Sequence, residues 1–343
     1  MTDMSTASSL CKSRLSCTDL VKPFFFVWFA LVVVFGSGLV TLLMAGLLTA
    51  CLAAGMLFYS LPPCSGGQAD AFFSNIRLVA HRGFALDAPE NTLAAIRKAK
   101  ASGADAVELD VSTSKDGVVV LLHDDTLDRT TDGSGPVGTL TIDELRRLDA
   151  AANFRGRLER DGKEPIPTLT EAMALCQQLG LKVMLDVKRH DNAMIRSLVE
   201  LFHSGEWAYH NVIVCSFDPC LLYGVKRRDP SVLTAQTWRH RFLSHEGADL
   251  EAPGRYADNP PLQGLASFAS AALVWAIHSW LWKLAGYDAL LTERCAISTA
   301  YVQLWRSRGL RVLVWTVNDA DEKRWMRRRL ALPYLTDTAA DES

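Results

Sequence analysis

Short β-type runs alternate with helical segments from residue 75 almost to the end of this 343-residue chain. Alternation of this kind predicts a parallel sheet that is covered by helices. Nine candidate strands over about 265 residues fit an eight-stranded barrel with one extra hairpin strand. An open doubly wound sheet is the alternative, but no Gly-x-Gly-x-x-Gly fingerprint follows the first strand. We therefore expect an α/β fold, a TIM (β/α)8 barrel, over residues 75–338.

Capping residues and glycines mark the ends of several expected helices. Ala94–Ala101 carries apolar residues at helical spacing, Asp143–Leu148 follows Thr141 as a cap, and Thr170–Leu179 ends at Gly180. The expected strands are Arg77–Ala80, Ala106–Val111, Val118–Leu122, Lys182–Val187, Val212–Ser216, Val232–Gln236, Ala296–Ser298, Val312–Val317 and Tyr334–Thr336.

The composition excludes several classes of protein. Lys and Arg total 36 and Asp and Glu total 38, so no global basic field is present to hold nucleic acid. Eight cysteines are too dilute for a disulfide scaffold. No Cys-x-x-Cys or His-x-x-x-His pair occurs, which argues against a structural zinc site.

An uncharged run follows a polar leader, residues 1–22, and covers Pro23–Leu61. A single span needs about 20 apolar residues, so this run predicts a membrane segment that is too long for one untilted helix. One long, tilted signal anchor is the favoured interpretation. A tight helical hairpin broken near Gly46 and a cleaved signal peptide are the alternatives.

The flanking charges predict the orientation of an integral membrane protein. Lys12, Arg14 and Lys22 precede the apolar run, whereas no Lys or Arg follows it until Arg77. Because positive flanks stay in the cytoplasm, a single span would leave the N-terminus cytoplasmic and the barrel lumenal or extracellular. A hairpin would return the barrel to the cytosol.

A second apolar stretch interrupts the barrel pattern at about residues 239–291. Its run from Leu262 to Trp282 has no Lys, Arg, Asp or Glu and is long enough to span a bilayer. The strands on both sides must nevertheless join one closed barrel, and a single crossing would separate them. We therefore expect a helical insertion that is interfacial or re-entrant, rich in Trp275, Trp280 and Trp282.

Ionisable side chains stand at the carboxyl ends of several expected strands, where catalytic groups gather in a parallel α/β barrel. Glu108 and Asp110 are two residues apart on one strand, so their carboxylates project from the same face. Two buried neighbouring anions are stable only if one is protonated or a cation binds between them. An isolated pair of this kind is more often an ordinary pair of surface acids.

Another strand repeats this arrangement and ends with Asp186 and Lys188. Asp186 would complete a three-carboxylate site, and Lys188 on the same face would meet a phosphate oxygen. Donors that are all oxygen favour Mg²⁺ over zinc, with Ca²⁺ as the alternative ion. The competing interpretation is a purely structural Asp–Lys pair.

Two histidines, His81 and His123, end different strands. Two imidazoles beside carboxylates at one rim suit general acid and general base catalysis near neutral pH. Arg82 offers a planar fork for a phosphate. Together with the three carboxylates and the lysine, these groups predict a metal-assisted phosphoryl-transfer site.

These motifs, in this order, resemble those of the glycerophosphodiester phosphodiesterase family, and most closely those of its membrane-anchored animal members. The resemblance covers about residues 77–337 and implies a metal-dependent TIM barrel similar to that of phosphatidylinositol-specific phospholipase C. The segments that carry it are His81-Arg82-Gly83, Pro89-Glu90-Asn91-Thr92, Glu108-Leu109-Asp110, His123-Asp124, Asp128-Arg129-Thr130-Thr131-Asp132-Gly133, Ile166-Pro167-Thr168-Leu169, Asp186-Val187-Lys188, Cys215-Ser216-Phe217 and Trp315-Thr316-Val317-Asn318.

The resemblance implies roles for individual residues. His81 and His123 would be the acid–base pair, Glu108 and Asp110 metal ligands, and Arg82 a phosphate contact. Most members of the family carry a Glu as the third ligand, where this chain has the shorter Asp186. Further residues implied near the site are Glu90 and Asn91, behind the ligands or against the glycerol, and Trp315, as a pocket wall or a core aromatic.

The implied reaction is hydrolysis of a glycerophosphodiester, such as glycerophosphoinositol or glycerophospho-N-acylethanolamine, to glycerol 3-phosphate and an alcohol. A lysophospholipase D that acts on lysolipids at the membrane is the alternative with the same chemistry. A catalytically silent, membrane-tethered interaction protein is the alternative of another class. The expected partners are the small-molecule substrate and membrane lipid, with no nucleic acid.

Overall fold

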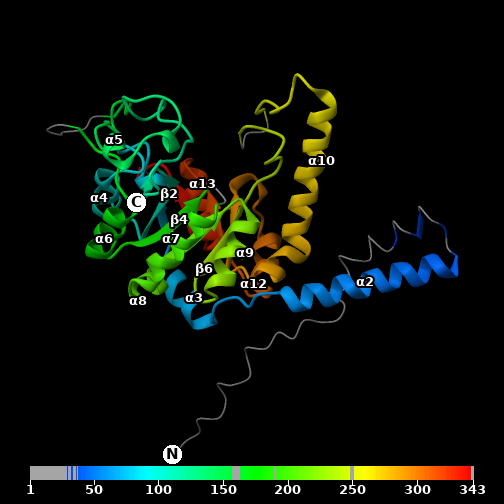
Figure 1. The fold of residues 1–343 in the computed structure, drawn as a ribbon. Helices are drawn as coiled ribbons and strands as arrows, with labels where there is room; N and C mark the ends of the chain where they lie inside the picture. The colour runs from blue at the N-terminus through cyan, green and yellow to red at the C-terminus, as the bar shows by residue number, and fades with distance from the viewer. Residues whose placement is uncertain are drawn as a thin grey trace, which may run out of the picture.

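The computed structural model describes residues 29, 32–33, 36, 38–156, 163–188, 191–247 and 251–340. The polar leader, residues 1–22, and the first residues of the uncharged run lie outside this part of the chain. Eight parallel strands form the predicted TIM barrel (Figure 1). Their order is β1-β9-β8-β7-β6-β5-β4-β2, and the pairing of β1 with β2 closes the sheet.

The ninth strand, β3, pairs antiparallel with β2 and is the predicted extra hairpin strand. The strands are β1 (Leu78–Ala80), β2 (Ala106–Thr113), β3 (Val119–Leu121), β4 (Lys182–Val187), β5 (Val212–Ser216), β6 (Leu233–Trp238), β7 (Ala289–Glu293), β8 (Arg311–Trp315) and β9 (Tyr334–Thr336).

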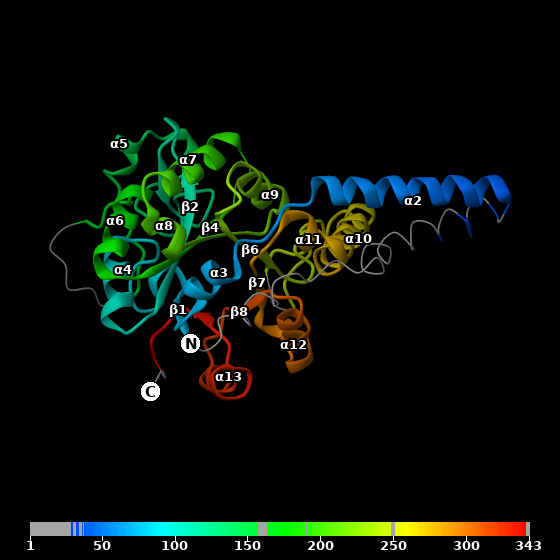
Figure 2. The same ribbon diagram turned by 90° about the horizontal axis from the view of Figure 1, so that it is seen from below.

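Helices cover the outside of the barrel and follow most of the strands (Figures 1 and 2). They are α3 (Gly66–Phe73), α4 (Leu93–Ala101), α5 (Ile142–Leu145), α6 (Leu169–Leu179), α7 (Asn192–His203), α8 (Glu206–Asn211), α9 (Pro219–Arg228), α10 (Pro260–Ala276), α11 (Trp282–Ala285), α12 (Thr299–Ser307) and α13 (Ala320–Trp325). Short 3₁₀ segments are η1 (His81–Gly83), η2 (Val137–Thr139) and η4 (Arg294–Ala296), and π-helical segments are η3 (Ile277–Leu281) and η5 (Met326–Leu330).

The predicted helix ends are largely confirmed. Thr141 caps α5 in a reciprocal capping box with Glu144, although this helix stops at Leu145 rather than Leu148. Gly180 ends α6 in the left-handed conformation (φ +62°), which costs glycine nothing. Local side-chain chemistry therefore sets these boundaries.

One strand prediction is wrong. Ala296–Ser298 is not a strand, because Arg294–Ala296 form the turn η4, and the strand is β7, Ala289–Glu293. The first residues of β7 are apolar. They begin only a few positions after α11, the last helix of the apolar insertion. The hydropathy pattern therefore hides the start of β7, which begins inside the stretch expected to belong to the insertion.

Side chains alternate between the inside and the outside of the barrel, as strand geometry requires. Val79, Ala106 and Met184 point inward, where they pack with Phe72 of α3 at the amino end of the strands. Outward residues such as Val107 pack against the helices instead. The inward register of β2 and β4 continues to the charged residues at their carboxyl ends, so the same alternation positions the site.

The helix α2 (Leu39–Tyr59) is 21 residues long, unbroken at Gly46, and extends away from the barrel (Figure 2). By length and composition, two helical segments among the described residues are able to cross a membrane: Leu39–Tyr59 and Pro260–Ala285. A helix that continues through Gly46 does not contain the break that a hairpin at this position needs.

The end of α2 is fastened to the barrel. The Leu61 amide donates to the Leu284 carbonyl at 2.9 Å, and the Tyr223 hydroxyl donates to the Tyr59 carbonyl at 2.9 Å. Gly286 has φ +64°, and a Cβ there would lie 2.5 Å from the Leu61 carbonyl oxygen. These contacts fix the direction in which α2 leaves the barrel.

A fully buried ion pair closes the amino end of the barrel. Lys226 Nζ donates to Asp288 Oδ2 at 2.7 Å and to the Val232 carbonyl at 2.9 Å. Asp288 also accepts the Cys64 amide at 2.7 Å and the Thr234 amide at 2.8 Å. The pair therefore joins the segment after α2 to α9 and to the start of β6.

Asp288→Ala is expected to lower the free energy of unfolding by about 3–5 kcal/mol, because it leaves the buried Lys226 ammonium without its anion. Chemical denaturation of the detergent-solubilised protein measures the effect. The control is Asp70→Ala, which removes an exposed pair with Arg311 and is expected to cost less than about 1 kcal/mol. Equal losses in the two variants would contradict this reading of the buried pair.

Candidate functional site

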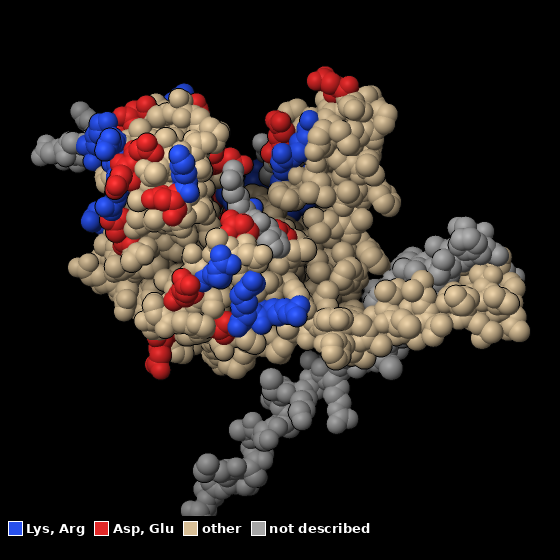
Figure 3. Space-filling model, viewed as in Figure 1, with Lys and Arg blue, Asp and Glu red and all other residues tan. Residues whose placement is uncertain are grey.

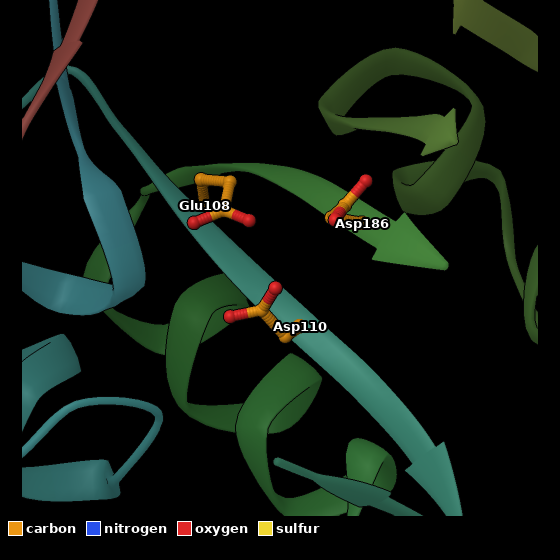
Figure 4. Close-up of side chains that lie close together, drawn as sticks. All are labelled: Glu108, Asp110 and Asp186. Carbon is orange, nitrogen blue, oxygen red and sulfur yellow. The ribbon is translucent and has the colours of Figure 1, made fainter. Parts of the chain in front are cut away.

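Three carboxylates meet at the carboxyl-end opening of the barrel, which we call the mouth (Figure 4). Glu108 and Asp110 come from β2, and Asp186 is the direct neighbour of Asp110 on β4. All three are buried, and one oxygen of each lies within 4.8 Å of the others. The structure thus brings together the three predicted acids, and they are not surface residues.

Two cations face the carboxylates. Lys188 Nζ lies 3.0 Å from Asp110 Oδ1 and 3.1 Å from Asp186 Oδ2. Arg82 Nε lies 3.5 Å from Asp110 Oδ2, and the Arg82 amide donates to Glu108 Oε2 at 2.9 Å. If all three carboxyl groups were ionised, they would outnumber the two bases and the cluster would carry an excess of negative charge.

The crowding of charge perturbs the carboxyl groups in opposite directions. Burial, followed by the neighbouring Asp110 charge, raises the pKa of Glu108 above its ordinary value. Burial alone would also raise the pKa of Asp110, but Lys188 and Arg82 outweigh it and hold that pKa well below its usual range. Asp110 is therefore the firmly ionised member, while Glu108 needs a further cation to ionise fully.

The donor set fits a hard divalent cation. Asp186 Oδ1 is buried and has no hydrogen-bond partner in the described part of the chain, so its lone pairs are available to an ion. The three candidate ligands offer only carboxylate oxygen, which suits Mg²⁺ or Ca²⁺. Glu108, Asp110 and Asp186 could hold such an ion.

His81 follows β1 and is held by a carboxylate. Its Nδ1 lies 2.6 Å from Asp337 Oδ1, and its Nε2 lies 4.0 Å from Glu108 Oε2. Burial would lower the pKa of His81, but the hydrogen bond to Asp337 and the charge of Glu108 outweigh it and raise this pKa. The imidazole thus has a fixed orientation beside the acidic cluster.

His123 follows β3 and is also held by a carboxylate, since its Nδ1 lies 2.5 Å from Asp124 Oδ1. Arg129 in turn fixes Asp124 through Nε at 2.6 Å and Glu90 through Nη1 at 2.7 Å. Burial, together with the nearby charges of Arg82 and Lys188, lowers the pKa of His123 despite the opposing effect of Asp110. Both rings use Nδ1 for this contact, which leaves Nε2 available for proton transfer.

The structure separates the roles of Glu90 and Asn91. Asn91 Nδ2 donates to Asp110 Oδ2 at 2.8 Å, and the Asp110 amide donates to Asn91 Oδ1 at 3.0 Å. Glu90 accepts from Arg82 at 3.1 Å as well as from Arg129. Asn91 therefore fixes Asp110, whereas Glu90 fixes the guanidinium groups of Arg82 and Arg129.

Aromatic rings line another part of the mouth. Trp315 ends β8, is partly exposed, and meets Phe217 edge to face with the ring centroids 5.6 Å apart. Phe217 follows β5 and stacks on Phe242 with centroids 4.3 Å apart. Trp315 also packs on the inner core of the barrel, so it belongs both to the core and to this wall.

Sequence reasoning did not give roles to the residues that orient the histidines, Asp337 and Asp124. Asp337 directly follows the strand predicted at Tyr334–Thr336, so the strand-end rule applied to β9 would have found it. Asn318 Nδ2 donates to Asp337 Oδ2 at 2.7 Å and fixes it. Asp124 and Arg129 lie in the motifs, but no local pattern shows that Arg129 reaches back to Glu90.

Comparison with known proteins gives consistent results. A model described as the glycerophosphoryl diester phosphodiesterase family matches residues 81–340. Glycerophosphodiester phosphodiesterase 1 of Homo sapiens is 38% identical over 323 residues, which cover 94% of this chain and 96% of that protein. The protein of the same name from Mus musculus is 38% identical over 326 residues, which cover 94% and 96%.

Solved structures share the fold. A glycerophosphodiester phosphodiesterase from Agrobacterium tumefaciens, 25% identical, matches with a TM-score of 0.56 over 77% of this chain and 97% of its own. An Oleispira antarctica phosphodiesterase, solved in complex with the product sn-glycerol-3-phosphate, matches with a TM-score of 0.55 at 24% identity over 76% and 92%. Because the family model matches residues 81–340 and the mammalian relatives align along nearly the whole chain, this chain belongs to the glycerophosphoryl diester phosphodiesterase family.

Proposed function

We propose that this chain hydrolyses glycerophosphodiesters. Water is added, the bond between phosphorus and the alcohol oxygen breaks, and glycerol 3-phosphate and a free alcohol are released. Membership of the family and the names of the mammalian relatives support this reaction. The observation that carries it is the pair of imidazoles, His81 and His123, each fixed by a carboxylate beside one buried acidic cluster.

In this proposal Glu108, Asp110 and Asp186 hold Mg²⁺, with Ca²⁺ as the alternative ion. When bound, a divalent cation supplies positive charge that stabilises the phosphate oxygens in the transition state. Arg82 and Lys188 add to that charge from the protein itself. Arg82 Nε makes no hydrogen bond among the described residues and lies 3.5 Å from Asp110 Oδ2, so it retains a proton that it could donate to a phosphate oxygen.

The two imidazoles move the protons. One accepts a proton from the attacking oxygen, and the other donates a proton to the leaving alcohol oxygen. The attacking oxygen belongs either to water or to the neighbouring hydroxyl of the glycerol, and the second route forms a cyclic phosphate that water then opens. Asp337 and Asp124 keep Nε2 of His81 and of His123 available for these transfers.

The favoured substrates are glycerophosphodiesters such as the water-soluble glycerophosphoinositol or glycerophospho-N-acylethanolamine, which carries an acyl chain on its headgroup. The aromatic wall of Phe217, Phe242 and Trp315 favours a second candidate, lysophospholipase D, because it offers apolar surface beside the charged cluster. Both candidates use the same hydrolytic chemistry. They differ in whether the glycerol of the substrate carries an acyl chain.

We further propose that α2 is a single transmembrane anchor. Its continuity through Gly46 and its exposed apolar surface support a span. The basic residues of the leader, Lys12, Arg14 and Lys22, favour a cytoplasmic N-terminus. The barrel would then be lumenal or extracellular.

His81→Ala and His123→Ala are each expected to lower kcat by about 10²–10⁴-fold, because each removes one proton-transfer group. The measurement is the rate of glycerol 3-phosphate release from glycerophosphoinositol. His210→Ala is the matched control, since this histidine is exposed on α8. Full activity in both site variants would refute the acid–base assignment.

Chelation of divalent ions is expected to abolish activity, and added Mg²⁺ to restore it. Asp186→Asn should raise the Mg²⁺ concentration for half-maximal activity by at least roughly tenfold, the smaller end of what residues behind a ligand contribute. Calorimetric titration with Mg²⁺ gives a readout that does not depend on turnover. Asp321→Asn is the control, because this side chain is 84% exposed. An unchanged Mg²⁺ requirement in Asp186→Asn would remove this residue from the ligand set.

Glycerophosphoinositol in water is expected to give a higher kcat/KM than lysophosphatidylinositol in bilayers. Phe242→Ser should leave the first rate nearly unchanged, because this ring belongs to the aromatic wall, where it stacks on Phe217, and not to the charged cluster. The measurement compares both rates in the parent protein and in the variant. A faster lysolipid reaction that Phe242→Ser selectively slows would instead establish the lysophospholipase D.

A further inference from the structure

The outer face of α10 is apolar and uncharged. Leu262, Leu265, Phe268 and Trp275 recur at helical spacing and are 39%, 63%, 72% and 43% exposed. The residues between them on this face are small or hydroxylic, among them Gly264 and Ser267. In Figure 3 the face of this helix that points away from the barrel shows neither Lys or Arg nor Asp or Glu along most of its length.

We call residues 239–259, which lead into α10, the return segment. The inner face of α10 packs on its described residues, 239–247 and 251–259. Gln263 Nε2 donates to the Ser244 carbonyl at 3.1 Å, and the Leu243 amide donates to Ser270 Oγ at 3.1 Å. Ala266 and Ser270 are buried in this contact. The helix therefore has an inner face that packs and hydrogen-bonds with the protein, and an outer face that the described residues leave exposed.

The connections of α10 argue against a bilayer crossing. The return segment leaves β6 and the end of α11 leads into β7, and these two strands are direct neighbours in the barrel. A crossing by α10 would therefore need the return segment to cross as well. This segment contains three Arg and four acidic residues, and charged groups are costly in hydrocarbon.

The placement of α10 relative to α2 points to a bilayer as its partner. The short α11, at the end of the same insertion, is hydrogen-bonded to the end of α2 through Leu61 and Leu284. α10 runs across the direction of α2, and both lie on the same side of the barrel (Figures 1 and 2). A bilayer spanned by α2 would therefore meet the uncovered face of α10 along its length.

We propose that α10 lies in the plane of the leaflet nearest the barrel, with its outer face in the boundary between headgroups and acyl chains. The inference rests on the proposed span by α2. Trp275 and Phe268 are side chains that interfacial helices place at this depth. The charged return segment, on the opposite side of the helix, stays in water.

In this placement, one wall of the mouth belongs to the return segment, which leads directly into the helix at the membrane surface. The return segment carries Phe242, which stacks on Phe217 at the mouth, and Arg239, whose guanidinium lies 5.5 Å from the Phe242 ring centroid. Figure 3 shows the hollow between this wall and the lobe that contains α5. The mouth therefore opens beside the lipid surface.

The test measures depth in the membrane without turnover, in the full chain reconstituted into phosphatidylcholine nanodiscs. Single spin labels are placed through Leu262→Cys, Phe268→Cys and Trp275→Cys, after replacement of the accessible native cysteines. Oxygen and a water-soluble nickel complex report the depth of each label. Gln177→Cys is the matched control, since this residue is exposed on α6, on the side of the barrel away from α2.

The three α10 labels are expected at one shallow depth, accessible to oxygen, while the label at Gln177 remains in water. If α10 spans, the labels at Leu262 and Trp275 will differ in depth by about 20 Å, given the helical rise. That result would overturn the proposal. So would three labels as water-exposed as the control, or three shielded from both reagents by a protein partner. None of these outcomes depends on whether the barrel hydrolyses a diester.

Discussion

Repulsion among three buried carboxylates is the constraint on which the mouth of the barrel depends. Glu108, Asp110 and Asp186 are brought within 4.8 Å of one another by two neighbouring strands, where little water screens their charges. Lys188 and Arg82 offset part of this repulsion. This repulsion is relieved if a cation binds among the three carboxyl groups or if one of them is protonated.

The scaffold supplies the rigidity that such a cluster needs. Asn91 forms hydrogen bonds with both the carboxylate and the amide of Asp110, and these bonds fix the orientation of the Asp110 side chain. Each imidazole is anchored by its own acid, Asp337 or Asp124. The side chains of the site are thus fixed by contacts from at least four strand ends. A closed barrel brings these strand ends together at one opening.

The sequence predicts the parts of this protein that have a local signature. The barrel, most strands and the caps at Thr141 and Gly180 follow from periodicity and from single residues. The clustering of Asp186 with Asp110 follows from the rule that parallel strands end together. The features that the sequence did not predict depend on packing between distant segments. β7 lacks a boundary in the hydropathy pattern, and the contact of Asp337 with His81 joins the two ends of the barrel domain.

The close fit at Gly286 has a mechanical consequence. The carbonyls of Leu61 and Pro62 occupy the space that a side chain would need, so the segment that follows α2 packs directly against the turn before β7. A loose tether would let the enzyme sample every tilt above a lipid surface. If α2 spans a bilayer as proposed, this close packing would present the same flank of the domain to the lipid surface in every copy of the molecule.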